Sequence, residues 1–271
     1  MAPQTAVLVT GASSGNGQAT ARLLAQRGYR VFGTSRNPST ADTTPGVEMV
    51  ALDVRSDDSV AACVKGVLDQ AGHLDVLVNN AGYELGGALE ELSLSEAQDQ
   101  FETNFFGVAR MVNAVLPTMR RQKRGRIVNI GSLAGLAPAP FLGMYSASKF
   151  ALEGYSEALR HEVKPFDIHV SLVEAGFLRT PLREKRQMAA QRLSEYDPWR
   201  QRALDAVREA EEKGPGPELV AHCVLEIIES NRPRLRYAVG QQARVVARLR
   251  RFLPAMAFEQ GTRRNFHLDM K

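Results

Sequence analysis

Short, unbroken apolar runs alternate along the chain with longer segments in which apolar residues recur every three or four positions. The periodic segments predict helices at residues 17–28, 56–68, 95–119 and 145–161. Strands that lack polar alternation and are separated by helices are typical of a parallel sheet with both faces covered. The sequence therefore predicts an α/β fold with one doubly wound, Rossmann-type parallel sheet and helices on both faces. The apolar runs place its strands at residues 5–11, 30–36, 47–54, 74–82, 125–132, 168–176 and 236–240.

Two segments interrupt this alternation. Residues 182–213 form a substrate-loop insertion after the sixth predicted strand, and residues 241–271 form a C-terminal extension after the last one. No repeat and no long linker divides the chain, so we expect a single domain over residues 1–271. The insertion either closes over a ligand as a lid or packs permanently against the body. Its large apolar side chains have the spacing of an amphipathic helix pair: Leu193, Tyr196, Trp199 and Leu204.

The composition is that of an ordinary globular protein and excludes some classes. Of 271 residues, 44% are hydrophobic and 24% are charged. The two cysteines, Cys63 and Cys223, make neither a metal-ligand spacing nor a disulfide framework, so we expect a reducing, cytoplasmic environment. The five histidines show no paired spacing, and we expect no metal site. No apolar stretch reaches the roughly 18 residues of a membrane span, and we see no signal peptide.

The net charge of +4 is concentrated near the C-terminus, where RPRLR and ARLRR occur. Such a basic tail has two interpretations: a contact with phosphate or anionic lipid, or a solvated helix face whose arginine stems cover apolar surface. We favour the solvated face, because no aromatic interleaving or nucleic-acid motif accompanies the charge. We expect no nucleic-acid partner.

Glycines gather between the first predicted strand and the first predicted helix, in TGASSGNG (10–17). They permit a tight turn and the close approach of a ligand to the backbone, and the helix N-terminus offers unpaired N–H groups to an anion. A doubly wound sheet binds the pyrophosphate of a dinucleotide at this place. The alternative is a glycine-rich connection that binds nothing. The spacing alone does not exclude it, because it differs from the commoner G-x-G-x-x-G. The candidate contacts here are Gly11, Ser13, Ser14, Asn16 and Gly17.

The end of the second predicted strand bears on the identity of the dinucleotide. An acid at this point binds the adenosine ribose of NAD(H) and repels a 2′-phosphate. This chain has Ser35 and Arg36 instead. A guanidinium can hold a phosphate dianion through its planar fork, so we predict NADP(H) over NAD(H). The alternative is that Arg36 is an ordinary surface arginine.

A tyrosine and a lysine lie four residues apart in YSASK (145–149). On a helix, Tyr145 and Lys149 project from one face. The pair is either exposed to solvent or lines a cleft, where the lysine cation would favour the tyrosinate and lower the pKa of the tyrosine. Three small residues between them keep this face low enough for a cofactor to lie against it.

With these motifs in place, the chain resembles the short-chain dehydrogenase/reductase family, and within it the 17β-hydroxysteroid and retinol dehydrogenase-like branch. The resemblance covers about residues 5–182 and the last strand. It rests on TGASSGNG, on NNAG (79–82), and on a tetrad found in order in FETNFFG, NIGS and YSASK: Asn104, Ser132, Tyr145 and Lys149.

The resemblance implies the roles of the tetrad. Tyr145 donates a proton to a carbonyl oxygen in reduction, or takes it from an alcohol in oxidation, and Ser132 hydrogen-bonds the same oxygen. Lys149 lowers the pKa of the tyrosine and holds the nicotinamide ribose. Asn104 supports a water through which protons reach the lysine.

The resemblance also implies further cofactor contacts, with two departures from the family pattern. Asn16 replaces an apolar residue of the loop, and Ala175 replaces the proline of a Pro-Gly pair, which loosens the turn before Thr180. The implied contacts beyond the loop and Arg36 are Asp53, Val54, Asn80, Ala81, Gly82, Tyr145, Lys149, Gly176 and Thr180.

An almost wholly apolar segment, LAGLAPAPFLGM, runs between Ser132 and Tyr145. It predicts a pocket for a lipophilic ketone or alcohol, to which Phe177, Leu178, Tyr196 and Trp199 would add a lid; these side chains would otherwise pack at a sheet edge or a subunit contact. Two alternatives remain: a 3-oxoacyl thioester reductase, and a non-catalytic nucleotide-binding regulator. The resemblance implies a homodimer or homotetramer that pairs through the helix at 95–119 and the helix that carries Lys149.

Overall fold

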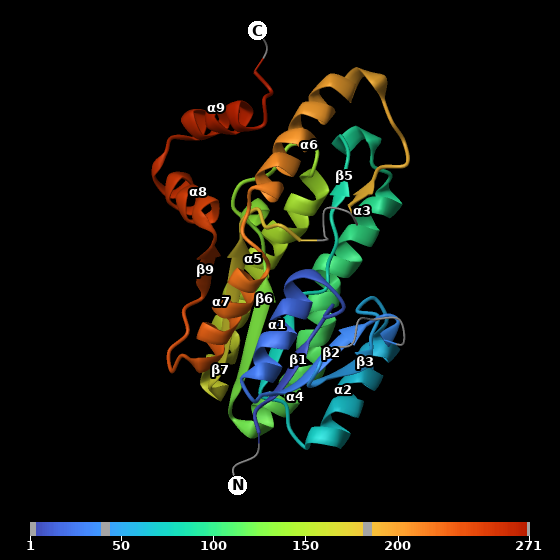
Figure 1. Cartoon of the computed structure of the whole chain (residues 1–271), viewed down its shortest axis with the longest axis vertical. Coiled ribbons are helices and arrows are strands. Elements are labelled where there is room, and N and C mark those ends of the chain that lie inside the picture. Colours follow the sequence, from blue (N-terminus) through green and yellow to red (C-terminus); the bar gives the residue numbers. More distant parts are fainter. Residues whose placement is uncertain (1–3, 39–43, 181–185, 270–271) are drawn as a thin grey trace.

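The computed structural model describes residues 4–38, 44–180 and 186–269. A parallel sheet forms its centre, with the strand order β3-β2-β1-β4-β6-β7-β9 (Figure 1). The first crossover runs outward from β1 and the later ones run the other way, so β1 and β4 flank the point where the order reverses. The strands of this sheet are β1 (Ala6–Val9), β2 (Arg30–Ser35), β3 (Val47–Ala51), β4 (Val76–Asn79), β6 (Gly125–Ile130), β7 (Ile168–Ala175) and β9 (Arg236–Val239).

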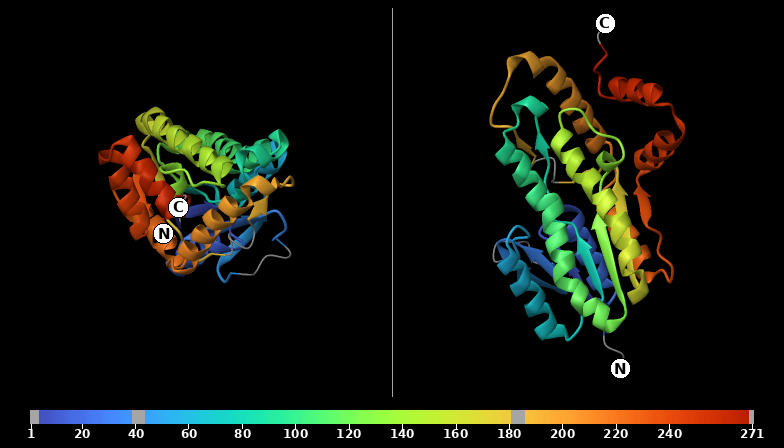
Figure 2. Two further views of the ribbon diagram at one scale, coloured as in Figure 1. Left: turned by 90° about the horizontal axis from the view of Figure 1, so that it is seen from above. Right: turned by 180° about the vertical axis from the view of Figure 1, so that it is seen from behind.

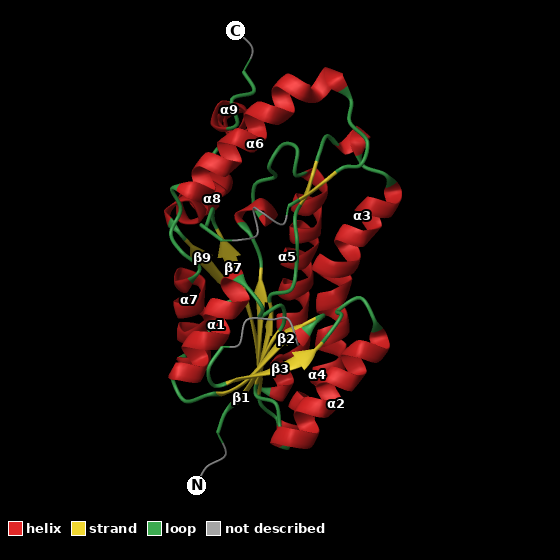
Figure 3. Ribbon diagram, turned by 45° about the vertical axis from the view of Figure 1, so that its right-hand side comes forward, coloured by secondary structure: helices red, strands yellow, loops and turns green. Residues whose placement is uncertain are grey.

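Helices cover both faces of the sheet (Figure 3). One face carries α1 (Gly15–Gln26) and α7 (Glu218–Glu229), and the other carries α2 (Asp57–Ala71), α4 (Gly107–Gln122) and α5 (Gly143–Val163). The strands supply both cores because alternate side chains point to opposite faces. In β1, Val7 and Val9 pack with the α1 and α7 side, whereas Leu8 packs with the α2, α4 and α5 side. The predicted doubly wound parallel sheet is thus confirmed.

Three elements were not predicted, and one was predicted too simply. The sequence analysis did not anticipate α7, although its apolar face is fully buried, and it did not anticipate the parallel pair β5 (Leu85–Gly86) and β8 (Gln187–Met188). The single helix expected at 95–119 consists of α3 (Leu94–Phe101) and α4, joined by a π-helical turn. Of the NNAG motif, only the first asparagine belongs to the strand β4.

The helix pair predicted for the insertion is wrong in the part of it that the structure describes, since residues 182–185 lie outside the described residues. This part contains β8, a 3₁₀ turn (Ser194–Tyr196) and one long helix, α6 (Asp197–Glu212). The apolar side of α6 is buried through Ala203 and Val207, which pack in a third cluster with Tyr145. The insertion is therefore held to the body along α6.

The extension consists of α8 (Gln241–Phe252) and α9 (Ala255–Asn265), and its residues 270–271 lie outside the described residues. Figure 2 shows both helices standing off from the sheet on the side of β9. The extension is attached at its two ends, because Ala243 is fully buried beside β9 and Phe266 is buried in the cluster with Ala203 and Val207. No helix in the described ranges is long and apolar enough to cross a membrane.

Candidate active site

A cavity of about 1280 Å³ opens at the carboxyl ends of β1, β4, β6 and β7. Every site residue that the sequence predicted lines this cavity, except Gly17. The cavity also takes in residues from α6, α8 and α9, so it reaches from the glycine-rich loop to the extension. Parallel strands direct the loops at their carboxyl ends to one edge of the sheet, which explains how residues 170 positions apart meet here.

The glycine-rich loop is held against the NNAG segment. The Asn80 Nδ2 donates to the carbonyl oxygens of Thr10 and Gly11, each at 3.0 Å. A Cβ added to Gly17 would lie 2.3 Å from the Gly11 oxygen and 2.4 Å from the Asn80 Nδ2. Gly17 therefore does not line the cavity, but its lack of a side chain leaves room for the hydrogen bond between Asn80 and the Gly11 carbonyl oxygen. Gly11 itself takes a φ of +66°, a conformation that favours glycine.

The N-terminus of α1 is suited to an anion. Its N-cap Ser14 makes no side-chain cap, and the first turn carries no acid. Two buried polar atoms beside it, the Asn16 Oδ1 and the Ser35 Oγ, have no hydrogen-bond partner among the described residues. Both residues line the cavity together with the exposed Arg36. The N–H groups of the helix start, the two polar atoms without partners and the Arg36 cation could together bind the phosphates of a dinucleotide.

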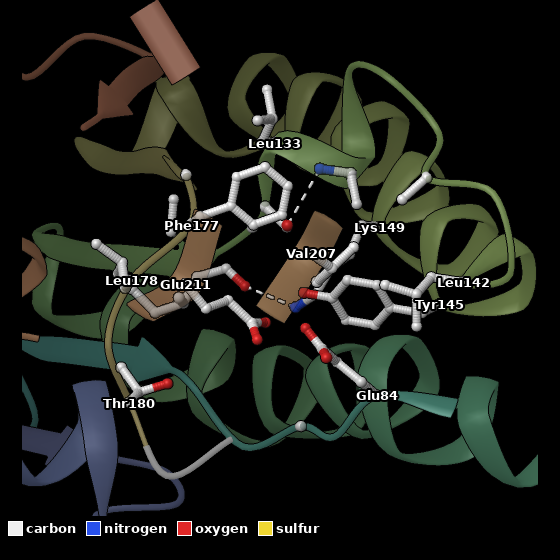
Figure 4. A pocket seen from close by; sticks show the side chains of 18 of the residues that line it. Glu84, Leu133, Leu142, Tyr145, Lys149, Phe177, Leu178, Thr180, Val207 and Glu211 are labelled. Atoms are coloured by element: carbon white, nitrogen blue, oxygen red, sulfur yellow. Dashed lines mark hydrogen bonds between the residues drawn. The ribbon is translucent and has the colours of Figure 1, made fainter. Parts of the chain in front are cut away.

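The helix α5 places Tyr145 and Lys149 on one face, as the spacing predicted, and Figure 4 shows both side chains pointing into the cavity. The Lys149 Nζ donates to the Ile130 carbonyl oxygen at 2.9 Å and lies 5.8 Å from the centre of the Tyr145 ring. Tyr145 and Lys149 are both 7% exposed, so the solvent-exposed pair is excluded. A hydrogen bond joins Tyr145 to the Ser132 side chain.

The expected lowering of the Tyr145 pKa is wrong for this arrangement. Burial and then the Glu84 carboxylate hold the pKa of Tyr145 well above its ordinary value, against the opposing hydrogen bond of Ser132. Burial also lowers the pKa of Lys149 to about 8, although Glu84 acts in the other direction. Desolvation outweighs the tyrosine–lysine attraction that the sequence suggested, because both side chains are withdrawn from water.

Asn104 lies in the π-helical turn Glu102–Phe106 between α3 and α4 and is 1% exposed. Its Oδ1 accepts from the Tyr83 N at 3.1 Å, and its Nδ2 donates to the Tyr83 oxygen at 3.0 Å and to the Ser148 Oγ at 3.3 Å. The wider turn lets the asparagine face the loop after β4 and α5 at once. Asn104 thus fixes Tyr83, whose neighbour Glu84 faces Tyr145.

Ser132, the remaining residue of the tetrad, follows a strand that a series of buried hydrogen bonds holds in place. The Asn79 Nδ2 donates to the Asn129 Oδ1, and the Asn129 Nδ2 donates to the Ser156 Oγ, each at 2.9 Å. These buried contacts join β4, β6 and α5, so β6, which ends two residues before Ser132, keeps its register with the helix of Tyr145.

The predicted lid is only partly correct. The apolar segment after Ser132 lines the cavity, and so do Phe177 and Leu178, but Tyr196 and Trp199 do not. Tyr196 instead donates to Glu90 at 2.7 Å. The part of α6 that faces the cavity lies about two to three turns further along the chain, at Ala206, Val207, Ala210 and Glu211.

Three charged side chains that the sequence analysis missed meet at the wall of this cavity, and Figure 4 labels two of them, Glu84 and Glu211. Arg186, which follows the insertion's first residues, lies 2.7 Å from the Glu84 Oε2 and 2.7 Å from the Glu211 Oε1. All three side chains are about nine-tenths buried. The cluster ties the loop after β4, the insertion and α6 together. A signal existed in Glu84, an acid inside an apolar stretch directly after NNAG.

The apolar side of the extension was also missed. Its cavity-facing residues recur every three or four positions along α8 and continue into α9: Val245, Val246, Leu249, Leu253, Ala257 and Phe258. This periodicity was visible in the sequence but was hidden by the arginines between its members. The described residues contain no group of three His, Cys, Asp or Glu that could hold a metal ion.

Comparisons with known proteins match this geometry. The family model described as short chain dehydrogenase matches residues 5–191. The 3-ketodihydrosphingosine reductase of Bacteroides thetaiotaomicron is 41% identical over 94% of this chain and 94% of its own. Retinol dehydrogenase 8 of Bos taurus is 41% identical (87% and 81% covered), and human 17-beta-hydroxysteroid dehydrogenase type 1 is 34% identical (91% and 81%).

Solved structures agree with the sequence relatives. A short-chain dehydrogenase from Streptomyces avermitilis matches with a TM-score of 0.80 and 33% identity over 98% of this chain and 99% of its own. A second match is a short chain dehydrogenase/reductase from Burkholderia phymatum in complex with NAD, with a TM-score of 0.72 and 29% identity over 86% of this chain and 88% of its own. A third is a metagenomic short-chain oxidoreductase in complex with NADP, with a TM-score of 0.67 and 28% identity over 86% of this chain and 95% of its own. Relatives of this fold therefore bind either dinucleotide.

Proposed function

The chain belongs to the short-chain dehydrogenase family, and on this premise we propose that it interconverts a lipophilic ketone or aldehyde and its alcohol with NADP(H). As a member of that family it is an oxidoreductase that acts on CH–OH and C=O groups with a nicotinamide nucleotide. The observation that carries the proposal is the meeting of Ser132, Tyr145 and Lys149 at the inner end of an apolar cavity. The bound nicotinamide would supply or accept the hydride.

In the proposed mechanism, the residues of the chain position the carbonyl and move one proton. Ser132 and Tyr145 hydrogen-bond the carbonyl oxygen, and Tyr145 donates its proton to that oxygen during reduction. The raised pKa of Tyr145 keeps the phenol protonated at neutral pH, which is the state that reduction requires. The Lys149 cation stabilises the tyrosinate that remains, and Asn104 holds the loop that closes this end of the cavity.

The cofactor would lie along the side of the cavity formed by the glycine-rich loop. The N-terminus of α1 would bind the pyrophosphate, and Asp53, Asn80 and Thr180, all in the cavity wall, would contact the adenosine and nicotinamide portions. NADP(H) is favoured because Arg36 and the orphaned Ser35 Oγ lie where a 2′-phosphate would need a cation and a donor.

Arg36→Ala is expected to weaken NADPH binding by about tenfold to a hundredfold while NADH binding changes less than about threefold, because a charge-assisted contact is worth roughly 1.5–3 kcal/mol. Cofactor fluorescence titration measures both. Arg22→Ala is the matched control, since Arg22 is exposed on α1 and lies outside the cavity wall. Equal weakening for both dinucleotides would contradict the proposed preference.

The substrate is proposed to be a long, largely apolar carbonyl compound. The wall beyond Ser132 is apolar, which supports this proposal. Two relatives are named for 3-ketodihydrosphingosine and for retinol, and both compounds are long and largely apolar. A coupled assay with NADPH should be run on 3-ketodihydrosphingosine, retinal, a steroid ketone and a 3-oxoacyl thioester. Turnover of the thioester alone would favour the thioester reductase, and dinucleotide binding without any turnover would favour the regulator.

Arg186→Gln is expected to raise KM for a long-chain ketone by about tenfold and KM for a small ketone by less than about twofold. Removing the guanidinium leaves two buried carboxylates uncompensated, which costs about 3–5 kcal/mol and loosens the insertion over the outer cavity. Steady-state kinetics on both ketones measure the effect. Arg192→Gln, which breaks an exposed ion pair on the same insertion, should leave both constants unchanged. Equal effects on both ketones would mean that Arg186 supports only the fold.

We further infer that residues 1–271 form one domain, since the described parts of the insertion and extension line the same cavity as the sheet. A homodimer or homotetramer remains a proposal. It is supported by exposed apolar side chains on the helices expected to pair: Leu94 on α3, Phe106 beside α4 and Phe150 on α5.

A further inference from the structure

The corner between α8 and α9 exposes large apolar side chains. Phe252 is 76% exposed, Met256 is 72% exposed and Leu253, between them, is 40% exposed. Pro254 breaks the helix at this point, so the three side chains gather at the turn. Neither Phe252 nor Met256 lines the cavity. In Figures 1 and 2 the two helices stand away from the body, which leaves this corner accessible.

The charge around the corner is strongly positive. Residues 241–271 carry seven Lys or Arg and two Asp or Glu, a net charge of +5, whereas the whole chain carries +4. The remainder of the molecule is thus slightly negative. The arginines of α8 whose side chains are described, Arg244, Arg248 and Arg250, are exposed. Of the two acids, Asp269 lies 3.4 Å and 3.9 Å from arginines of α9. The net positive charge of the chain therefore comes from the extension.

The corner is continuous with the cavity. Val245, Leu249 and Leu253 are each about 40–46% exposed and also line the cavity. An apolar surface therefore runs from the tip of the extension inward along α8, toward the apolar wall that follows Ser132.

We propose that the α8–α9 corner is a docking surface for an anionic lipid bilayer, with Phe252, Leu253 and Met256 at the level of the head groups and the arginines of α8 on lipid phosphates. Apolar insertion and a basic cluster are the two contributions that stable interfacial binding needs. A second copy of the chain fits less well, because a two-fold contact here would bring Arg248 and Arg250 of both copies together. The docked corner opens the cavity toward the lipid; this delivery role rests on the proposed function, whereas the binding does not.

Co-sedimentation of the full chain with vesicles tests the binding. Vesicles of equal parts phosphatidylcholine and phosphatidylglycerol should bind the protein at least about tenfold more strongly than pure phosphatidylcholine, and added salt should weaken the binding. The double variant Phe252→Ser, Met256→Ser should bind at least about tenfold more weakly at the same salt. The double variant Arg248→Gln, Arg250→Gln should lose much of the preference for anionic vesicles. Leu89→Ser, which removes an exposed apolar side chain on the 3₁₀ turn Leu89–Glu91, away from the extension and the proposed subunit contacts, should bind as the unchanged chain does.

Two further measurements separate the alternatives. Sedimentation velocity without lipid should give one oligomeric state for the unchanged chain and for Phe252→Ser, Met256→Ser; dissociation of the variant alone would assign the corner to a second copy and overturn the proposal. Binding of the unchanged chain to neither vesicle, or binding unaffected by the serine substitutions, would also overturn it. Reduction of a small water-soluble ketone should be the same for this variant and the unchanged chain. The vesicle assay needs no turnover, so a failure of the proposed reaction would leave its result interpretable.

Discussion

Tyr145→Phe is expected to lower kcat for ketone reduction by about 10²–10⁴-fold, the range that a positioned general acid contributes. The substitution removes the proton donor and keeps the ring that packs with Ala203 and Val207. Dinucleotide affinity should therefore change little. Single-turnover kinetics with NADPH and fluorescence titration of the cofactor measure the two quantities separately.

Tyr155→Phe is the matched control for this experiment. Tyr155 lies on the same helix, burial raises its pKa to about 12, and its ring packs against Phe105. Because it is outside the cavity wall, the loss of its hydroxyl should leave turnover unchanged. If Tyr145→Phe retained near-normal turnover on a good substrate, the proton would have to come from another group.

The same site predicts the pH dependence of reduction. The raised pKa of Tyr145 keeps the donor protonated through neutral pH. The pKa of Lys149 is about 8, so its cation is present below that pH and is lost as the pH rises through it. Loss of the cation removes the charge that stabilises the tyrosinate, and kcat for reduction should fall above about pH 8. A profile that rises through this range would contradict the role of Lys149.

Gly17→Ala is expected to have the second large effect, on both stability and cofactor binding. The new Cβ would meet the Gly11 oxygen at 2.3 Å and the Asn80 Nδ2 at 2.4 Å, and the first of these is backbone that cannot rotate away. Overpacking of this kind costs about 1–3 kcal/mol. If the loop yields rather than the helix, the same energy appears as a loss of up to about a hundredfold in dinucleotide affinity. Thermal unfolding measures the loss of stability, and fluorescence titration measures the loss of dinucleotide affinity.

Gly66→Ala provides the comparison within one protein. Gly66 lies inside α2, and a Cβ there meets nothing within 4 Å. Replacing an unhindered helical glycine by alanine should stabilise the fold by about 0.5–1 kcal/mol. If Gly17→Ala lowers the free energy of unfolding and Gly66→Ala raises it, the loop geometry, and not the loss of a glycine as such, accounts for the Gly17 effect. A neutral Gly17→Ala would mean that the loop can move aside.

Sequence patterns predicted the parts of this fold that are buried on two sides. The strand β1 contributes Val7 to one core and Leu8 to the other, so it reads as an unbroken apolar run. The helix α5 was recognisable because Tyr145 and Lys149 share a face. By contrast, α7 was not predicted, because KGPGP directly before it is typical of a loop and the chain between the insertion and the last strand gave no other strong signal.

The parts of the site that could not be predicted depend on contacts distant in sequence. Glu84 and Arg186 are 102 residues apart, and only the pairing of β5 with β8 brings them together. The π-helical turn around Asn104 leaves no pattern in the sequence, since one extra residue per turn shifts a helix face without changing composition. The direction of the Tyr145 pKa was misjudged for the same reason: a sequence shows which charges are near but not how far water is excluded.

The distribution of the cavity wall along the chain bears on how such enzymes diversify. The residues that would contact the dinucleotide, and the tetrad, all lie between Gly11 and Thr180, whereas α6, α8 and α9 come after them. Mutations in this later third of the chain can reshape the outer wall without disturbing the sheet edge where proton and hydride would move. Duplicated genes of this design can therefore acquire new substrates while keeping one inherited chemistry, and the insertion and the extension are where such divergence should accumulate first.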